Sequence, residues 1–393
     1  MNDPSSQHAT EQAISDLARG LGFTLLGIAP AEPTPYRQYV RKWLEAGRHG
    51  QMQYLADRIE LRLDPRRFVP GARCVIAVAD RYAPVADREP VPAHGASIPS
   101  GGPTTNTAAG STRPAATGKI ARYAWGDDYH QIIKKRLHRL ADLMRQRWPQ
   151  DTYRPCVDTA PTFEREHARG AGLGWIGKHT LLIHPSLGSW LLLGQIVTTL
   201  AIEVARGPTV PIEDHCGQCT HCIDACPTQC IDPAGYKLDA QRCISYLTIE
   251  HRGPIDPDLH RPMGDWIAGC DVCQQVCPFN DPQRAADASL HPAYAPRPPA
   301  PAIDLAEALK WDATDRRRAF QRSALKRIKL DQFKRNAIIA AGNHLAEHAD
   351  GPLRRQIEQL AGDESESSLV RTTAQQVLAR LPSHDGTGRA RST

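Results

Sequence analysis

Cysteine spacing carries the clearest chemical signal in this sequence. Residues 216–227 read C-x2-C-x2-C-x3-C-P, and residues 270–278 repeat the C-x2-C-x3-C-P ending after an earlier Cys243. In bacterial ferredoxins this spacing places three thiolates on one iron–sulfur cube and the fourth on a second cube. The second set contains an insertion, residues 244–269, after its first cysteine. The pattern therefore predicts two 4Fe-4S clusters that exchange their fourth ligands.

Each predicted cube draws its ligands from both cysteine sets. The ligands expected for the first cube are Cys216, Cys219, Cys222 and Cys277. Those expected for the second cube are Cys243, Cys270, Cys273 and Cys226. A pair of zinc sites is the alternative, but zinc usually takes two well-separated Cys-x2-Cys pairs. The spacing thus favours iron–sulfur clusters over zinc.

The length and composition of the chain fit an intracellular enzyme-sized protein. At 393 residues and 41% hydrophobic, the chain can bury a core and is expected to form two or three domains. It has no 18-residue apolar run and no N-terminal secretion signal, so we expect no membrane span and no export. Eight of the eleven cysteines fall in the cluster motifs, leaving Cys74, Cys156 and Cys230. We therefore expect a reducing, cytoplasmic location.

Positive charge is concentrated near the C-terminus. Residues 316–335 hold nine Lys or Arg and one acid, Asp331, so this block has a net charge of +8. Because the whole chain has a net charge of +5, the remaining residues together carry −3. A basic block on a near-neutral body is typical of a protein that docks a polyanion such as nucleic acid. A solvated helix face is the alternative explanation.

Hydrophobic periodicity predicts an α+β protein. Helical patterns and short apolar strands alternate over residues 11–200, as in an α/β or α+β catalytic domain of residues 1–205. Residues 83–118, rich in Pro, Gly, Ser and Thr, are expected to form a flexible insertion in it. A ferredoxin-like domain is expected at 206–290, a helical HEAT-like segment at 303–381 and a disordered tail at 382–393.

A single carboxylate stands at a junction between two predicted elements. The apolar run 153–158 predicts a strand that ends at Asp158 and passes into a helix at Thr159–Pro161. The end of a strand is where α/β folds collect catalytic groups, so Asp158 is a candidate catalytic acid. Alternatively, Asp158 only caps the following helix. Further along, four glycines within residues 170–177 allow close backbone approach without matching a P-loop or a dinucleotide fingerprint.

Taken together, several stretches resemble epoxyqueuosine reductase, an iron–sulfur and cobalamin enzyme family that completes queuosine in tRNA. The resemblance runs in order from about residue 11 to residue 381. The matching stretches are Val157–Pro161 with Glu164-Arg165, Ala171–Lys178, Cys243–Gly253, Gly269–Gln274 and the basic Lys326–Lys329 before Arg335–Ala337. The chain departs from the family pattern at Thr159, at His179 and in the 83–118 insertion.

The resemblance implies a cobalamin that no residue pattern shows, since the chain has no D-x-H-x-x-G run that would place a histidine on cobalt. In this family the corrinoid binds without such a lower ligand, beside one of the clusters, so the 1–205 domain would be corrinoid-binding. The contacts implied are Arg58, Tyr123, Asp158, Lys178, Ser245, Asp271 and Gln274. The tRNA contacts implied or expected from the basic block are Arg252, Lys326, Arg327, Lys329, Lys334 and Arg335.

The implied reaction converts the epoxide of epoxyqueuosine in tRNA to the alkene of queuosine. Two electrons and two protons enter and water leaves. Breaking the epoxide C–O bond builds charge on oxygen, which Asp158 is expected to quench as proton donor, with a pKa raised by desolvation. Electrons would pass from the clusters to cobalt, which either attacks the epoxide carbon or transfers electrons to it. An unidentified donor reduces the clusters, and we expect a monomer.

Two other functions compete with this interpretation. A corrinoid reductive dehalogenase would have a similar build, but such enzymes generally carry a twin-arginine leader, and the basic C-terminal block would have no role. A ferredoxin-type electron carrier would leave about two hundred residues before the clusters unexplained. Retention of cobalamin by the purified protein separates an electron carrier from the two enzymes.

Overall fold

The computed structural model describes residues 4–83, 116–202, 212–281 and 290–382. Most of the insertion expected at 83–118, and the tail after residue 382, lie outside these residues. Residues 117 and 118 do not belong to that insertion, because Thr117–Ile120 forms strand β3. No described helix combines the length and the apolar character needed to cross a membrane.

A four-stranded antiparallel sheet forms the centre of the N-terminal part, in the order β1-β2-β7-β4. Its strands are β1 (Leu25–Pro30), β2 (Cys74–Arg81), β7 (Leu191–Thr198) and β4 (Tyr153–Cys156). Strand β2 is buried along its whole length because both faces of the sheet are covered. The prediction of a mixed helix-and-strand fold is confirmed. The α/β alternative for this part is wrong, since every pairing in the sheet is antiparallel.

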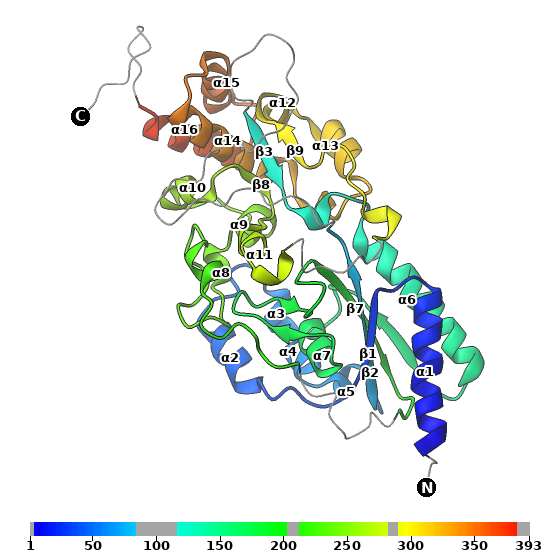
Figure 1. Ribbon diagram of the computed structural model, residues 1–393. Helices are drawn as coiled ribbons and strands as arrows, with labels where there is room; N and C mark the ends of the chain where they lie inside the picture. The colour runs from blue at the N-terminus through cyan, green and yellow to red at the C-terminus, as the bar shows by residue number, and fades with distance from the viewer. Residues whose placement is uncertain (1–3, 84–115, 203–211, 282–289, 383–393) are drawn as a thin grey trace.

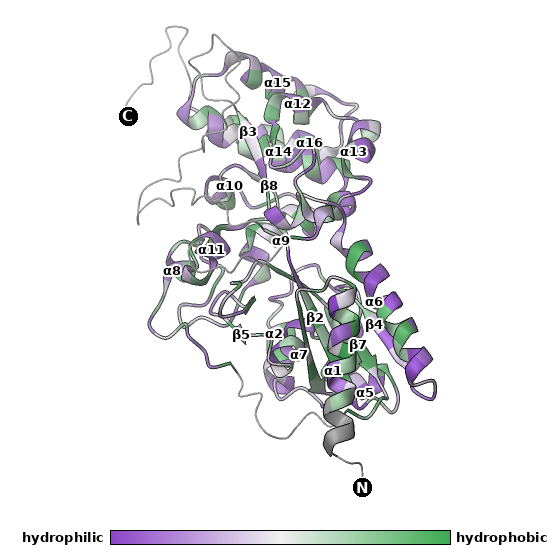
Figure 2. Ribbon diagram, turned by 45° about the vertical axis from the view of Figure 1, so that its right-hand side comes forward, coloured by the Kyte–Doolittle hydropathy of each residue, from purple (hydrophilic) through white to green (hydrophobic). Residues whose placement is uncertain are grey.

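Helices cover both faces of this sheet, with large side chains on one face and small side chains on the other. Helices α1 (Pro4–Gly20) and α6 (Tyr129–Arg147) pack large aliphatic residues on one face, where Ile14, Leu137 and Ile196 are fully buried (Figure 1). Figure 2 shows hydrophobic and hydrophilic residues alternating along α6, as one apolar stripe requires. Helix α7 (Glu164–Gly170) covers the other face at close range through small residues such as Ala168. This close packing holds α7 against β1, β2 and β7.

Short elements complete the N-terminal part. They are the helices α2 (Arg37–Glu45), α3 (Tyr54–Asp57), α4 (Ile59–Leu63) and α5 (Pro65–Phe68), the 3-10 helix η1 (Arg122–Ala124) and the hairpin of β5 (Trp175–Ile176) with β6 (Leu182–Ile183). Strand β6 is only two residues long. Position 174 requires glycine, because its φ of 152° is rarely adopted by residues with a side chain and a side chain there would collide with the Ile183 carbonyl.

The cysteine-rich part consists of short helices joined by loops. They are α8 (His221–Asp224), η2 (Ala240–Arg242), α9 (Ile244–Ile249), α10 (Pro257–Met263), α11 (Val272–Gln275) and η3 (Pro278–Asn280). The insertion 244–269 supplies α9, α10 and strand β8 (Trp266–Ala268). It thus carries much of the apolar surface that joins this part to its neighbours.

A second sheet links segments that are far apart in the sequence. Strand β3 pairs in parallel with β8 and antiparallel with β9 (Ala302–Asp304). After η4 (Pro292–Tyr294), the C-terminal elements are α12 (Leu305–Lys310), α13 (Ala313–Phe320), η5 (Ala324–Arg327), α14 (Leu330–Glu347), α15 (Gly351–Gly362) and α16 (Ser368–Arg380). One hydrophobic core runs from Ile120 through the insertion to Val377. The three expected domains therefore share this sheet and core, as Figure 1 shows for β3, β8 and β9.

Candidate active site and cluster-binding module

Asp158 lies two residues beyond β4 in the left-handed backbone region, at φ 50°. Asp and Asn tolerate this conformation better than other residues with a side chain. The Asp158 N–H donates a 2.7 Å hydrogen bond to Oε1 of Glu164. Helix α7 begins only at Glu164, with Phe163 before it, so the helix expected at Thr159–Pro161 is absent and Asp158 caps no helix. Its unusual backbone conformation instead directs its carboxylate toward α6.

His130 joins Asp158 to a second carboxylate. Its Nε2 lies 3.0 Å from Asp158 Oδ2, and its Nδ1 lies 2.7 Å from Asp128 Oδ1. Asp128 caps α6 through the His130 N–H and also pairs with Lys326 from the C-terminal part. The ring of Tyr129 stacks on the imidazole with centroids 4.0 Å apart. The result is a continuous chain of charge-assisted contacts from Lys326 to Asp158.

This chain reverses the pKa shift expected for Asp158. Desolvation raises the pKa of Asp158, but the hydrogen bond and charge of His130 outweigh it, so the pKa is lowered. Burial likewise lowers the pKa of His130, yet its bonds to Asp128 and Asp158 raise that pKa to about 9. At neutral pH the proton therefore resides on the imidazolium, hydrogen-bonded to Asp158. Desolvation alone was the wrong basis for predicting a protonated Asp158, because the imidazole supplies an opposite charge.

Glu164 is the second unusual carboxyl at this place. Burial, and then the charge of Asp158, raise the pKa of Glu164 to about 8, so it is protonated at neutral pH. Its neighbour Arg165 donates a 2.6 Å hydrogen bond to the Thr180 carbonyl, which anchors α7 to the loop before β6. Two proton carriers thus contact the same residue, because His130 pairs with the Asp158 carboxylate and Glu164 accepts from the Asp158 N–H.

Further charged and aromatic groups surround Asp158. Arg327 Nη2 lies 2.9 Å from Glu250 Oε1, and burial together with the charges of Glu250 and Asp158 raises the pKa of Tyr54. Tyr54 is 44% exposed and marks the solvent-facing rim of the group. Arg58 is exposed at the junction of α3 and α4, close enough for its charge to affect Arg62. These groups come from five separate stretches, and only tertiary folding brings them together.

The sequence did not single out His130, Glu164, Tyr54 or Glu250 as site residues. The only local signal for His130 was the Asp128-x-His130 spacing at the start of a helix. Glu164 lay within a stretch that carried the family resemblance, but no role was expected for it.

Three of the residues expected at a cobalamin lie near one another. Burial raises the pKa of Tyr123 and the charges of Asp271 and Asp158 raise it further, which places all three within electrostatic reach. Asp271 Oδ2 accepts a 2.7 Å hydrogen bond from the Arg122 N–H. Asp271 directly precedes helix α11, which carries Cys273, so this group connects Asp158 to the cysteine-rich part.

Three more of the seven residues expected at a cobalamin, Lys178, Gln274 and Ser245, lie in the cysteine-rich part or contact it. Lys178 Nζ donates to the carbonyls of Gly217 and Cys219 at 2.7 and 3.0 Å. The Gln274 amide is held by Ser189 and Tyr82. Ser245 lies in the first turn of α9, two residues after Cys243. Each of the three therefore belongs to the cysteine-rich part or contacts it, and their contact with a cobalamin stays a prediction.

The predicted cluster ligands gather in two groups of four. Burial, and then the charges of Cys277, Cys216 and Cys219, raise the pKa of Cys222 to about 12, so these four lie together despite their distance in sequence. Burial raises the pKa of Cys273, and the charges of Cys243 and Cys226 raise it further. Burial likewise raises the pKa of Cys270, as do the charges of Cys273 and Cys243. In the described part of the chain, no three His, Cys, Asp or Glu side chains are close enough to hold a single metal ion. The two groups match the ligand sets expected for the two cubes.

The basic block divides into exposed and buried members. Lys326, Arg327 and Lys329 are exposed, as is Arg252 from the insertion. Arg335 has no exposed surface and donates to the carbonyls of Leu247, His251 and Gly253. Burial lowers the pKa of Arg335 to about 10, which still leaves it charged at neutral pH.

Two members of the predicted phosphate-binding set are therefore wrong. Arg335 cannot contact a phosphate, because its guanidinium is enclosed by carbonyl oxygens. Lys334 is also excluded, because its side chain is 8% exposed and pairs with Glu366.

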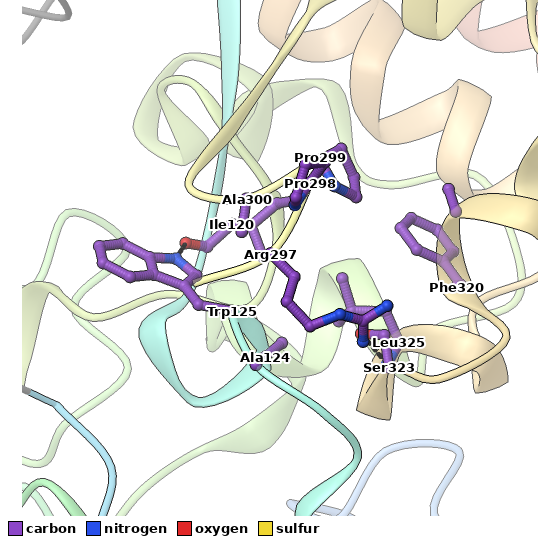
Figure 3. A pocket seen from close by; sticks show the side chains of 12 residues that line it. Ile120, Ala124, Trp125, Arg297, Pro298, Pro299, Ala300, Phe320, Ser323 and Leu325 are labelled. Atoms are coloured by element: carbon purple, nitrogen blue, oxygen red, sulfur yellow. Dashed lines mark hydrogen bonds between the residues drawn. The ribbon is translucent and has the colours of Figure 1, made fainter. Parts of the chain in front are cut away.

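A separate pocket lies behind η1, between the C-terminal helices and the loop at 297–300. Figure 3 shows Trp125, Arg297 and Phe320 around it. Arg297 pairs with Asp127, the residue before the α6 cap. None of the expected site residues lines this pocket, so it is distinct from the Asp158 group.

Comparison with known proteins places the chain in a family. Residues 62–159 match the family model "Epoxyqueuosine reductase QueG, DUF1730", and residues 215–280 match "4Fe-4S double cluster binding domain". Epoxyqueuosine reductase of Xanthomonas campestris pv. campestris is 37% identical over 330 residues, covering 84% of this chain and 86% of that protein. The Escherichia coli enzyme is 34% identical over 345 residues, covering 87% of this chain and 83% of that protein.

Solved structures agree with the sequence comparisons. A crystal structure of selenomethionine-labelled epoxyqueuosine reductase matches with a TM-score of 0.79 and 25% identity, over 96% of this chain and 92% of that chain. A second, of epoxyqueuosine reductase with an epoxyqueuosine-modified tRNA-Tyr stem loop, has a TM-score of 0.76 and 25% identity, over 94% and 89%. By its sequence relatives, its matched segments and its fold, this chain belongs to the epoxyqueuosine reductase family.

Proposed function

We propose that this protein reduces the epoxide of epoxyqueuosine in tRNA to the alkene of queuosine, the last step of queuosine biosynthesis. Family membership over 84% of the chain at 37% identity is the observation that carries the proposal. The site chemistry supports it, because a proton-donating cluster lies beside a module for electron-carrying clusters. A relative binds an epoxyqueuosine-modified tRNA stem loop, which supports tRNA as the substrate.

The reaction consumes two electrons and two protons and releases one water. The first proton goes to the epoxide oxygen as its C–O bond breaks, and the second converts the resulting hydroxyl into leaving water. Asp158 is the group we assign to the first transfer, with the proton supplied through its 3.0 Å contact with His130. Glu164, whose pKa is raised to about 8, is a protonated carboxyl close enough to Asp158 to restore it. The site thus holds two protons at neutral pH.

Asp128 and Lys326 position this donor. Asp128 is buried, and although burial raises its pKa, the bonds to His130 and Lys326 hold that pKa at about 2. A permanently ionised Asp128 keeps the Nδ1–H of His130 directed toward it, so Nε2 faces Asp158. Lys326 lies on the segment that we assign to tRNA binding. Docking of tRNA and placement of the proton donor therefore share one residue.

The cysteines provide the electron path in this proposal. The first cube would be held by Cys216, Cys219, Cys222 and Cys277, and the second by Cys226, Cys243, Cys270 and Cys273. Cobalamin, when bound, supplies a cobalt centre that takes electrons from the clusters and delivers them to the epoxide carbon. The residues that would hold it are Arg58, Tyr123, Asp158, Lys178, Ser245, Asp271 and Gln274.

The tRNA would bind over the exposed basic residues Arg252, Lys326, Arg327 and Lys329. Phosphate contacts of this kind position the substrate without reading its sequence. Tyr54 and the Arg327–Glu250 pair lie within electrostatic reach of Asp158, so a modified base that enters the site would pass them. We also propose a cytoplasmic monomer, with the 206–290 and 303–381 segments acting as the cluster and tRNA-binding parts.

Mass spectrometry of tRNA nucleosides tests this function directly. Anaerobic protein, a low-potential reductant, cobalamin and epoxyqueuosine-containing tRNA should yield queuosine. Omission of cobalamin should abolish the product. Persistence of epoxyqueuosine with fully loaded protein would overturn the proposal.

A further inference from the structure

The cysteine-rich part contains a ninth thiol outside the two ligand sets. Cys230 lies within residues 215–280, the segment that matches the double-cluster family model, but not at a position of the C-x2-C-x2-C-x3-C-P pattern. It is 6% exposed and packs with Cys222 and Ile231. The remaining unassigned thiols, Cys74 and Cys156, lie in strands β2 and β4 of the large sheet. Cys230 alone of these three therefore lies in the cluster module.

The backbone after Cys226 returns Cys230 to the preceding ligand. The N–H of Gln229 donates to the Cys226 carbonyl at 3.0 Å, and Gln229 has φ 51°, which reverses the chain. The Cys230 N–H then donates to Cys226 Sγ at 3.4 Å. The Asp239 N–H bonds to the Cys230 carbonyl at 2.9 Å and fixes the turn from the other side.

The Cys230 side chain lies beside two proposed ligands of the same cube. Its Sγ lies 3.4 Å from Cys226 Sγ, and Cys230 is close enough to Cys243 for each thiol to shift the pKa of the other. Cys243 in turn is near Cys270 and Cys273. Five thiols therefore meet where a cube needs four ligands.

We propose that Cys230 is a reserve ligand of the second cluster, able to take the iron position of Cys226. While Cys226 is bound, the Cys230 thiol donates an S–H hydrogen bond to a ligand sulfur. When Cys226 is missing, the Cys230 thiol releases its proton to solvent and its thiolate binds the vacated iron, with no change in oxidation state. This inference rests on the two-cluster assignment in the proposed function.

Iron content of anaerobically reconstituted variants tests the proposal. Wild type should hold close to eight irons, as two four-iron cubes require. Cys226→Ala should retain close to eight, because Cys230 substitutes. The double variant Cys226→Ala/Cys230→Ala should lose iron from the second cube. Cys277→Ala, which removes the matching ligand of the first cube, should lose iron as a single change, since Cys230 lies at Cys226 and Cys243.

The outcomes distinguish failure of the reserve-ligand proposal from failure of the two-cluster assignment on which it rests. Iron-free wild type would overturn the two-cluster assignment itself. Wild type with eight irons and a Cys226→Ala variant that loses as much as the double variant would overturn the reserve-ligand proposal alone. The reserve-ligand proposal would also be overturned if Cys230→Ala lost iron while Cys226→Ala kept close to eight irons, because Cys230 would then be the primary ligand.

A second measurement remains valid if Cys226→Ala fails to fold. Cys230→Ala should keep eight irons but lower the reduction potential of one cluster, because a hydrogen bond to a ligand sulfur stabilises the reduced state. Cys230→Ser, which keeps a donor, should restore part of that potential. Electron paramagnetic resonance during a redox titration follows the cluster directly. An unchanged potential in Cys230→Ala would show that the thiol makes no contact with the cluster.

Discussion

His130 Nε2 lies 3.0 Å from Asp158 Oδ2, so the proposed proton donor of this enzyme is one half of an ion pair. The pair joins the first turn of α6 to the loop after β4, two segments that only the folded sheet brings together. An acid that must be protonated to react is here kept ionised, with its proton stored one bond away. The catalytic unit is therefore the pair rather than the carboxylate alone.

Replacing the carboxylate separates its chemical role from its conformational role. Asp158→Asn should lower single-turnover epoxide reduction by about 10²- to 10⁴-fold, the usual contribution of a general acid. Its stability should change little, because Asn also tolerates φ 50°. Asp158→Ala should lose activity and also stability, by about 1 kcal/mol, because Ala is strained in this region.

Activity and thermal unfolding of these two variants, with cluster and cobalamin content measured alongside, decide the matter. A fully active Asn variant would move the proton donor to another group, with Glu164 the next to replace. If both variants lost the same amount of stability, backbone strain at residue 158 would not be the cause of the lower stability of Asp158→Ala.

The His130–Asp158 pair predicts a specific pH dependence of stability. The pKa of His130 is raised to about 9 from an ordinary value near 6.5, so its contribution is complete below pH 6.5 and disappears as pH rises through 9. The pKa of Asp158 is lowered, so its contribution is complete above its ordinary value near 3.9 and disappears as pH falls below that. The pair therefore stabilises most between about pH 4 and 6.5.

His130→Gln tests this window. The difference in Tm between wild type and His130→Gln should be largest near pH 6 and close to zero above pH 9. His138→Gln, at an exposed position on the same helix, provides the matched control and should show no such profile. A Tm difference that does not vary with pH would mean that His130 acts through packing on Tyr129 alone.

The sequence was sufficient where residue spacing itself encodes the site, and it failed where a contact between distant segments carries no such pattern. Cysteine spacing placed Cys277 with Cys216 across sixty residues, because a cube imposes its own geometry. It did not reveal His130 as the partner of Asp158, since no short-range pattern couples α6 to the end of β4. A helix was predicted after Asp158 from Pro161, but the chain extends to Glu164 before α7 begins.

The basic block shows the same limit in a different way. Arg335 was counted as one more surface charge because it belongs to a run of nine Lys and Arg residues. Its position on α14 next to Phe333 and Ala337, both fully buried, was the available signal that this turn faces the core. Arg335 binds carbonyls of the insertion at 244–269. The hydrophobic periodicity of α14 cannot predict these partners.

Arg335 is expected to be a structural clamp. Arg335→Gln should destabilise the protein by roughly 3 kcal/mol, because buried carbonyls of Leu247, His251 and Gly253 lose their donors. Arg355→Gln, at an exposed position on α15, should change stability by less than about 0.5 kcal/mol. Denaturant unfolding of the two variants gives the comparison. Unchanged stability with weakened tRNA binding in Arg335→Gln would instead restore the phosphate-contact interpretation.

The exposed basic residues should control how tRNA binding depends on salt. Lys326 is left intact in this test, because it also holds Asp128. The triple variant Arg252→Gln/Arg327→Gln/Lys329→Gln should bind tRNA more weakly at low salt. The slope of log affinity against log salt should decrease by roughly two to three, since each lost phosphate contact removes about 0.7 to 0.9.

A control that removes equal charge elsewhere makes this result specific. Arg139→Gln/Arg145→Gln/Arg147→Gln changes three exposed arginines toward the far end of α6, a helix whose 19 residues start at the Asp128 cap. If the basic residues bind phosphates directly, this control should keep the wild-type slope, because only local contacts release counterions. Equal loss in both triple variants would mean that net charge alone attracts the tRNA. An unchanged slope in the first variant would leave its three residues as a solvated face, and the phosphate contacts would then have to be sought on α13, where Arg317 and Arg318 are also exposed.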